Sequence, residues 1–370
     1  MKTFLVSFAL SACCLTAFAQ TYFEPFADAT GSGGTAYANA DNLAGEINAQ
    51  ANKWYPVGTS STGASVIITN GSLNVTNTLP AGTGNSVLLV NQLGVGGRFN
   101  IGGHSTATNL TLFYSVFIQL NDITSLSTNA NTVSNSGGVF NMGFNNTTGS
   151  DPGQGSQPSI IGATLYMGST NGGYILGTGR NTGNLGNRFW ETNTATPHQV
   201  GEVLFVVLEY EAVAGATNND LARLWINPNP STFGAATYPT PDVIVGDPSH
   251  MPASDADLST INSFVLMNRN ATQPNNMIVD ELRIGTNWAQ VTPSTNAVAV
   301  IPILNISTVD PNTVQLSWRA DATGFTLQSV AQLLSSGTPW ANVPGSPTPS
   351  DTNLIQTDAI SGTKFYRLIK

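Results

Sequence analysis

The chain has 370 residues, only 9% of them charged, and its formal net charge is −9. An acidic chain without a basic stripe repels phosphate backbones, so nucleic acid and anionic membranes are poor partners, whereas neutral polymers such as polysaccharides are not penalised. Gly, Asn, Ser and Thr supply the polarity, which favours strands joined by turns over helices.

Residues 1–19 have the pattern of an export signal. Lys2 precedes an apolar run from Phe4 to Leu15, and Ala17-Phe18-Ala19 is the small-x-small motif of a cleavage site. This run is shorter than the about 20 residues that span a bilayer. Residues 10–13 also fit a lipobox, so lipidation at Cys13 is the alternative. We expect a secreted or cell-surface protein that begins at Gln20.

Both cysteines, Cys13 and Cys14, lie in the segment expected to be removed. The remaining chain has no thiol, which excludes disulfides, thiol catalysis and cysteine-bound zinc.

Short apolar runs separated by turn residues follow along the chain. Asn70-Gly71 predicts a hairpin between strands at 66–69 and 73–75. Further strands are expected at 87–91, 110–120, 138–144, 159–167, 173–176, 200–210, 222–227, 263–268 and 277–285. Many strands without an amphipathic helix indicate an all-β sandwich or jelly roll.

Two of these strands are expected at the centre of the fold. In 110–120, Leu112, Tyr114 and Val116 share one face, while Phe113 and Phe117 lie on the other. The run 203–210 is apolar on both faces, as in a strand covered on both sides.

The character of the chain changes near residue 293. Residues 293–300 read as a linker, and 301–370 as a small β module. Val314, Leu316 and Trp318 alternate with polar residues in its clearest strand. Because a segment of this size has a marginal core, large aromatic side chains are expected to be buried in it.

Three segments of residues 22–292 resemble the concanavalin A-like lectin/glucanase sandwiches, particularly the laminin-G-like type. They are Phe23-Glu24-Pro25-Phe26 with Trp54, then 204–210 followed by Leu221-Ala222-Arg223-Leu224-Trp225, and finally Asp280-Glu281-Leu282-Arg283-Ile284-Gly285. The tail resembles a fibronectin-type or immunoglobulin-like module through 313–318, 324–328 and 364–368. The resemblance implies a jelly-roll sandwich with a small β-sandwich-like module.

The resembled group contains lectins, adhesion modules and glycosidases, so the fold alone does not decide the function. Its glucan-hydrolysing members carry a Glu-x-Asp-x-Glu strand, which this sequence lacks. The nearest pattern is Glu209-Tyr210-Glu211. Two carboxyl groups on one strand face are the minimum for glycoside hydrolysis. We expect these glutamates at a solvated sheet rim, with a loose ion pair to Arg223.

Carboxylates elsewhere suggest structural roles or a cation. Regular alternation places Asp280 and Glu281 on opposite faces, one of them meeting Arg283 or a loop amide. Asp255 with Asp257, and Asp242 with Asp247, are candidate calcium ligands. No standard calcium loop surrounds either pair, so no metal or cofactor is assigned and calcium stays an option.

Aromatic residues offer a different kind of site, because sugar rings stack on Trp and Tyr. Trp190, with Asn187 and Arg188 beside it, is the candidate ligand site, since asparagine and arginine hydrogen-bond sugar hydroxyls. The sequence therefore predicts a non-catalytic binding module for carbohydrate or another extracellular surface. The alternatives are a glycan-cleaving enzyme with dispersed carboxylates and a purely structural or adhesion protein.

Overall fold

The computed structural model forms two compact units, residues 20–296 and 297–370. It describes residues 22–27, 37–48, 52–58, 64–73, 79–80, 82, 84–90, 95–126, 142–151, 158, 160–170, 172–181, 188–192, 195–249, 257–268, 273–294, 303–319, 325–333, 338–350, 353–360 and 362–369. The expected signal peptide with Cys13, most of the expected linker, Asn187 and Asp255 lie outside these residues.

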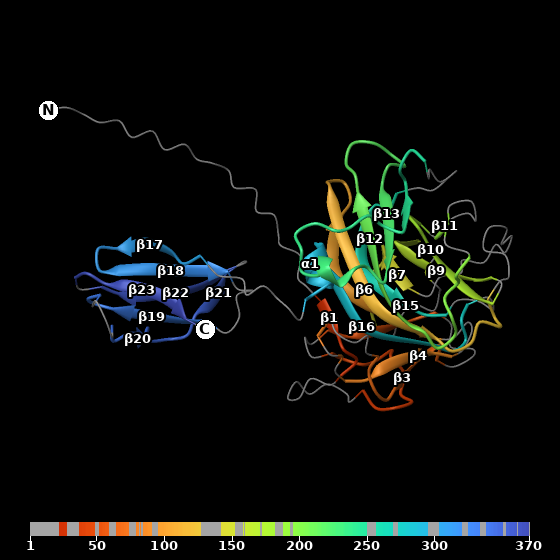
Figure 1. The fold of residues 1–370 in the computed structure, drawn as a ribbon, viewed down its shortest axis with the longest axis horizontal. Helices are drawn as coiled ribbons and strands as arrows, with labels where there is room; N and C mark the ends of the chain where they lie inside the picture. The colour runs from red at the N-terminus through yellow and green to blue at the C-terminus, as the bar shows by residue number, and fades with distance from the viewer. Residues whose placement is uncertain are drawn as a thin grey trace. The chain divides into compact units, whose positions relative to one another are not determined.

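An eight-stranded sheet, here called the back sheet, runs through the first unit (Figure 1). Its order is β14 (Val243–Val245), β13 (Leu221–Ile226), β12 (Val203–Ala212), β6 (Leu110–Leu120), β16 (Met277–Gly285), β4 (Ser86–Leu89) and β3 (Val66–Thr69), with β1 (Tyr22–Glu24) also paired to β16.

Two smaller sheets, here called the front sheets, lie against one face of the back sheet. The five-stranded one has the order β2 (Trp54–Val57), β5 (Gly96–Ser105), β15 (Thr260–Leu266), β7 (Met142–Asn145) and β8 (Ile161–Gly162). The three-stranded one has the order β11 (Phe189–Trp190), β10 (Gly173–Gly179) and β9 (Thr164–Thr170). All pairs of these strands are antiparallel, so the unit is an all-β sandwich, as predicted.

The alternation of β6 explains why this sheet lies inside the unit. Tyr114 and Val116 point into the main core, which they share with Phe144 and Phe264 of the front sheets. Phe117, on the opposite face of β6, belongs to a second buried cluster. Burial on both faces confirms the prediction for this strand.

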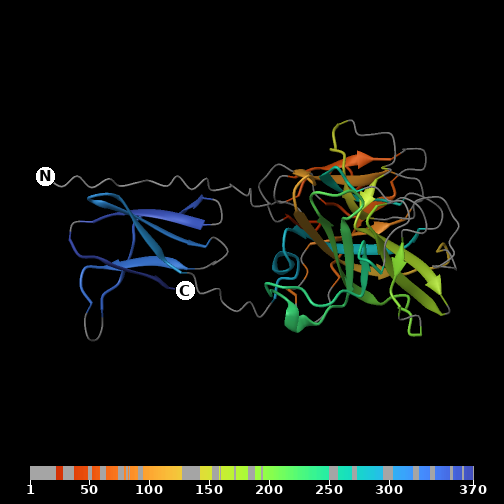
Figure 2. The ribbon, with the colours of Figure 1, turned by 90° about the horizontal axis from the view of Figure 1, so that it is seen from above.

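The second cluster covers the outer face of the back sheet. Phe205 and Trp225 of the sheet pack there with Trp288 and Val291 of α1 (Trp288–Val291). The side chain of Asn287 caps this helix by accepting a hydrogen bond from the Gln290 amide at 3.0 Å. The short helix therefore covers part of the outer face of the back sheet, and both ribbon views show it beside the strands (Figures 1 and 2).

Residues 74 and 75 of the hairpin expected at Asn70-Gly71 lie outside the described residues, and Leu73 is not in a strand. β3 pairs with β4, whose residues lie 17 to 23 positions further along the chain. Gly71 does have the positive φ of a turn residue, at 89°. The amide of Leu73, however, donates to the carboxylate of Asp280 at 2.7 Å, which draws this segment across the sheet.

The second unit has its own two sheets. One has the order β17 (Asn305–Asp310), β18 (Thr313–Arg319), β22 (Asn353–Ala359) and β21 (Thr348–Ser350). The other has the order β20 (Ala341–Asn342), β19 (Thr326–Val330) and β23 (Phe365–Ile369). Val314, Leu316 and Trp318 are buried between them, as their alternation predicts. Across the described ranges, no helix has the length and apolarity needed to cross a membrane.

A chain that ends at Ser294 is expected to fold without the second unit. Thr292, which is fully buried, closes the first unit through its amide and hydroxyl hydrogen bonds to Trp288 O. Its thermal unfolding, followed by calorimetry, should remain one cooperative transition. A molten or insoluble product would mean that the two units share a core.

Candidate functional site

The outer face of the front sheets carries an apolar cluster, here called the front-face cluster. Its buried members are Val57, Ile161, Tyr166, Val265 and Met267, and Trp190 packs against them half-buried. In β9, Leu165 and Met167 point into the main core while Tyr166 points to this opposite face. The alternation of a single strand thus places an aromatic ring outside the sandwich core.

Tyr166 and Trp190 lie in one row across three strands. Both residues pair with Gly177 of β10, from opposite sides. Their ring centroids are 6.3 Å apart and the ring planes are inclined by 46°. A Cβ atom at position 177 would lie 2.8 Å from the Trp190 ring, so only glycine leaves room for the indole there. The local sequence therefore builds a two-ring platform, in which Trp190 is partly exposed and Tyr166 is only 1% exposed.

Arg188 adds a cation to this platform. Its guanidinium carbon lies 4.7 Å from the centroid of the Tyr166 ring, which is the range of a cation–π contact. The residue is only 8% exposed. Its Nε and Nη1 atoms are buried, and neither has a hydrogen-bond partner. Donors of this kind usually have partners in a folded protein, so Arg188 has hydrogen-bonding capacity that the described contacts do not use.

The structure thus brings together two of the three predicted ligand residues, Trp190 and Arg188. Tyr166 is a residue that the sequence analysis missed. Its only signal is the alternation of the segment 164–167, because both of its neighbours are apolar core residues.

Glu191, which follows Trp190 in the chain, makes polar contacts with β10 and His198. One carboxylate oxygen accepts a hydrogen bond from the Leu176 amide at 2.7 Å and lies 3.2 Å from Nε2 of His198. This group fastens β11 to β10.

The expectation of a solvated rim for Glu209 and Glu211 is wrong for Glu209. Its side chain is 1% exposed, whereas that of Glu211 is 33% exposed. Nη1 of Arg223 lies 2.6 Å from Oε2 of each. Burial raises the pKa of Glu209 to about 7, although Arg223 opposes this shift. Glu209 is buried because Phe113 of β6 and Arg223 of β13 flank it in the sheet.

This arrangement fits a structural ion cluster better than a hydrolytic pair. Glycosidases leave about 5 Å or more between two carboxyl groups so that the sugar reacts between them. Here a guanidinium nitrogen occupies that space. The ring of Tyr238, 5.6 Å from the guanidinium carbon of Arg223, lies over the same group.

A β-bulge alters the expected alternation at Asp280 and Glu281. The register with β6 shifts between Asp280 and Arg283, and Glu281 has a φ of 53°. Both carboxylates are buried. Asp280 accepts from the amide of Leu73, and Glu281 lies 2.5 Å from Nη2 of Arg283. The expected contacts with a loop amide and Arg283 are therefore confirmed.

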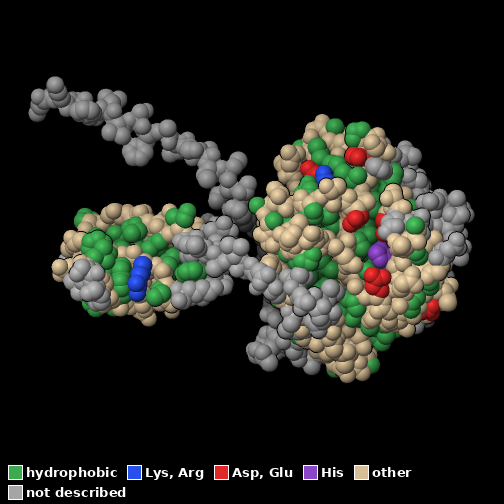
Figure 3. All heavy atoms as spheres, viewed as in Figure 1, with side chains coloured by type: hydrophobic (Ala, Val, Ile, Leu, Met, Phe, Trp, Pro, Cys, Tyr) green, Lys and Arg blue, Asp and Glu red, His purple; other side chains and the backbone are tan. Residues whose placement is uncertain are grey.

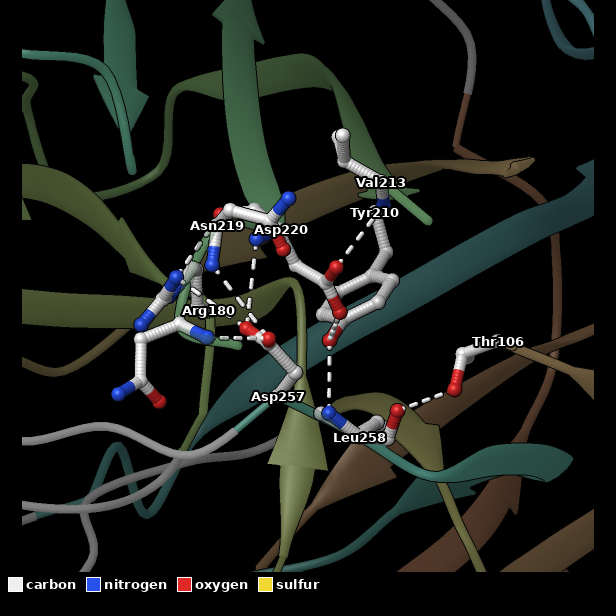
Figure 4. A network of polar contacts seen from close by, with 9 residues as sticks. Thr106, Arg180, Tyr210, Val213, Asn219, Asp220, Asp257 and Leu258 are labelled. Atoms are coloured by element: carbon white, nitrogen blue, oxygen red, sulfur yellow. Dashed lines mark hydrogen bonds and ion pairs between the residues drawn. The ribbon is translucent and has the colours of Figure 1, made fainter. Parts of the chain in front are cut away.

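The structure argues against Asp257 as a calcium ligand. Its oxygens accept hydrogen bonds from the amides of Asn218, Asn219 and Asp220, and Oδ1 lies 3.3 Å from Nη1 of Arg180 (Figure 4). Oxygens already bound to amides and facing a guanidinium are poorly placed to hold a cation. The described part of the chain contains no group of three or more His, Cys, Asp or Glu side chains with metal-binding geometry.

This network instead closes one end of the sandwich. Figure 4 shows the Tyr210 hydroxyl between Asp220, to which it donates at 2.5 Å, and the Leu258 amide, from which it accepts at 2.9 Å. Asp220 also accepts from the amide of Val213. The loop between β12 and β13 is thereby tied to the segment that precedes β15.

The outer face of the back sheet holds an apolar cavity of about 260 Å³. It is lined by Leu79, Phe117, Val203, Phe205, Asn227, Pro228, Pro230 and Phe233. Asn227 is the polar side chain of this lining, and its Oδ1 already accepts from the Phe205 amide at 2.9 Å. The cavity therefore offers little for binding sugar hydroxyls, in contrast to the Arg188 platform.

Comparison with known proteins gives likenesses of fold only. Neither the models of known protein families nor the sequences of curated proteins match this chain. Domain 4 of an extracellular arabinanase from Geobacillus stearothermophilus, in complex with arabinotriose, is similar at 13% identity and a TM-score of 0.33, covering 65% of this chain and 86% of that one.

Two further solved structures have a similarly low sequence identity and TM-score. An endo-β-1,4-glucuronan lyase from the fungus Trichoderma reesei matches at 13% identity and a TM-score of 0.32, over 65% of this chain and 98% of that one. The ligand-binding domain of botulinum neurotoxin serotype D, in complex with N-acetylneuraminic acid, matches at 10% identity and a TM-score of 0.34. The match covers 82% of this chain and 67% of that one.

Proposed function

We propose that residues 20–296 form an exported, non-catalytic carbohydrate-binding module of the concanavalin A-like sandwich type. Its binding site is the platform of Tyr166, Trp190 and Arg188 on the front sheets. The observation that carries the proposal is the pairing of two aromatic rings, one of them half-buried, with a buried guanidinium whose Nε and Nη1 lack partners. Aromatic faces stack on sugar rings, and arginine donors bind their oxygens.

The character of the surface supports the same proposal. Charged side chains are sparse on the face shown in Figure 3, and neutral polar and apolar atoms dominate it. A surface of this kind suits a hydrated polysaccharide, because contact does not require the removal of many ion hydration shells from the protein.

Glycan cleavage is the second candidate function, and one observation favours it. The pKa of Glu209, raised to about 7 by burial, is in the range of a general acid. The guanidinium between Glu209 and Glu211 and the 1% exposure of Glu209 favour the binding module instead.

Trp190→Ala is expected to weaken binding roughly tenfold, because the stacking face for the sugar is lost. Affinity gel electrophoresis of the mature chain, in gels with neutral or acidic polysaccharides, measures this. Tyr238→Ala is the matched control, because Tyr238 is an aromatic residue, 40% exposed, that packs over the outer face of the back sheet. Equal losses in both variants, or no retardation of the wild type by any polysaccharide, would contradict the proposal.

A further inference from the structure

Arg188 differs in its partners from three other arginines of the described ranges whose side chains are at most 11% exposed. Arg180, Arg223 and Arg283 each lie within 4.0 Å of a carboxylate, at Asp257, at Glu209 with Glu211, and at Glu281 respectively. No such ion pair is formed by Arg188, and its polar contact is with the face of the Tyr166 ring.

A buried guanidinium without an anion is costly, because desolvation of the charge is not offset by a partner. The cation–π contact with Tyr166 offsets part of this cost on one face of the planar group. Nε and Nη1, whose hydrogen atoms lie in the plane of the guanidinium, are left without acceptors. The position is therefore preformed for an anionic group that arrives with a ligand.

We infer that the site selects saccharides that carry a carboxylate, with Arg188 binding the carboxylate while Trp190 stacks on the sugar ring. This inference rests on the proposed function and names its ligand class. Nε and Nη1 lie on different edges of the guanidinium, so a carboxylate would accept from one of them singly or from that atom together with Nη2. A planar N–H pair of this kind matches a carboxylate better than it matches a single hydroxyl, and charge-assisted hydrogen bonds are the stronger ones. A sugar acid is the ligand that offers a carboxylate beside a ring of the size that an indole covers.

The acidic character of the chain does not oppose this binding at short range. The full chain has a net charge of −9. At physiological salt, repulsion between separated charges is screened beyond about 8 Å. The contact at Arg188 is shorter than this, so the local cation decides the interaction.

The test uses the mature full-length chain with polygalacturonate, alginate and hyaluronan, each compared with its own carboxyl-reduced form. Isothermal titration calorimetry of the wild type should show binding to at least one native polymer and roughly tenfold to hundredfold weaker binding to its reduced form. Arg188→Gln should abolish this difference, and Arg188→Lys should keep part of it, because the charge is retained without the fork. Dextran sulfate tests whether any polyanion suffices.

Fold integrity is checked with a second variant. Arg188→Met removes an unpaired buried charge, so its Tm should be no lower than that of the wild type, whereas a structural arginine would lower the Tm on removal.

Two results would overturn the inference alone. One is equal affinity for a native polymer and its carboxyl-reduced form, with binding still sensitive to Trp190→Ala; this leaves the proposed function intact and removes only the ligand class. The other is binding of dextran sulfate that depends on Arg188 as strongly as binding of the native polymer does. Failure to bind any acidic or neutral polymer overturns the proposed function together with the inference.

Discussion

Arg223→Met is expected to lower the free energy of unfolding of the first unit by about 3 kcal/mol. The guanidinium of Arg223 lies 2.6 Å from both Glu209 and Glu211, and its side chain is 11% exposed. Removing it leaves the buried carboxyl group of Glu209 without its cation. This cost exceeds the about 1 kcal/mol of an exposed ion pair, which the rim location predicted from the sequence would have implied.

The double variant Glu209→Leu with Arg223→Met is the matched control, because it removes both charges from the same place. It should be more stable than Arg223→Met alone, since apolar replacements of a buried pair are often well tolerated. Urea unfolding followed by tryptophan fluorescence measures both. A loss of less than about 1 kcal/mol in the single variant would show that the pair behaves as a solvated one.

The stability of the first unit is expected to rise when the pH is lowered from 8.5 to 5.5. Three buried carboxyl groups have raised pKa values in the folded state, mainly because burial disfavours their charged forms: Glu24 at about 7, Glu209 at about 7 and Asp280 at about 8. A carboxylic acid whose pKa is higher in the folded than in the unfolded chain binds more protons when folded. Its contribution to stability is therefore fully present at low pH and is lost as the pH rises from the unfolded to the folded pKa.

His198 acts in the same direction. Burial disfavours its charged form, but Glu191 and Glu202 outweigh this and raise its pKa above the ordinary value. A raised histidine pKa also gives stability that is lost as the pH rises through the folded pKa. The Tm at pH 5.5 should therefore exceed that at pH 8.5 by on the order of 5 °C.

Asp280→Asn isolates one of these groups. The amide oxygen of asparagine still accepts the hydrogen bond from the Leu73 amide, but the side chain no longer titrates. The variant should show a shallower dependence of Tm on pH, especially between pH 7 and 8.5. A Tm that increases with pH over this range would contradict the burial of these carboxyl groups.

The sequence predicted the sandwich because the period of its apolar residues is unambiguous in the long strands. Leu110–Leu120 and Met277–Gly285 are observed with the predicted bounds. The alternation in these strands depends on local sterics and burial, which a sequence expresses directly.

Contacts between segments that lie far apart in the sequence could not be predicted from it. β3 pairs with β4, and the Leu73 amide just after β3 bonds to Asp280, 207 residues further along the chain. Similarly, the burial of Glu209 depends on its neighbours in β6 and β13. A local pattern carries no signal for either.

In the candidate site, too, the sequence predicted residues of suitable chemistry but not the contacts between strands. Trp190 and Arg188 were singled out as residues of the right chemistry, but Tyr166 entered only with the register of β9, β10 and β11. Gly177 makes this register possible, because a larger residue would displace the indole. The binding role of the three residues stays a prediction until a ligand is observed.

A crystal structure of the mature chain with an oligosaccharide of the polymer that binds most tightly tests the central claim most directly. We predict a sugar ring in van der Waals contact with Trp190 and its acidic group within hydrogen-bond distance of Arg188. A sugar bound at Glu209 and Glu211, or in the apolar cavity beside Phe117 and Phe205, would contradict the claim.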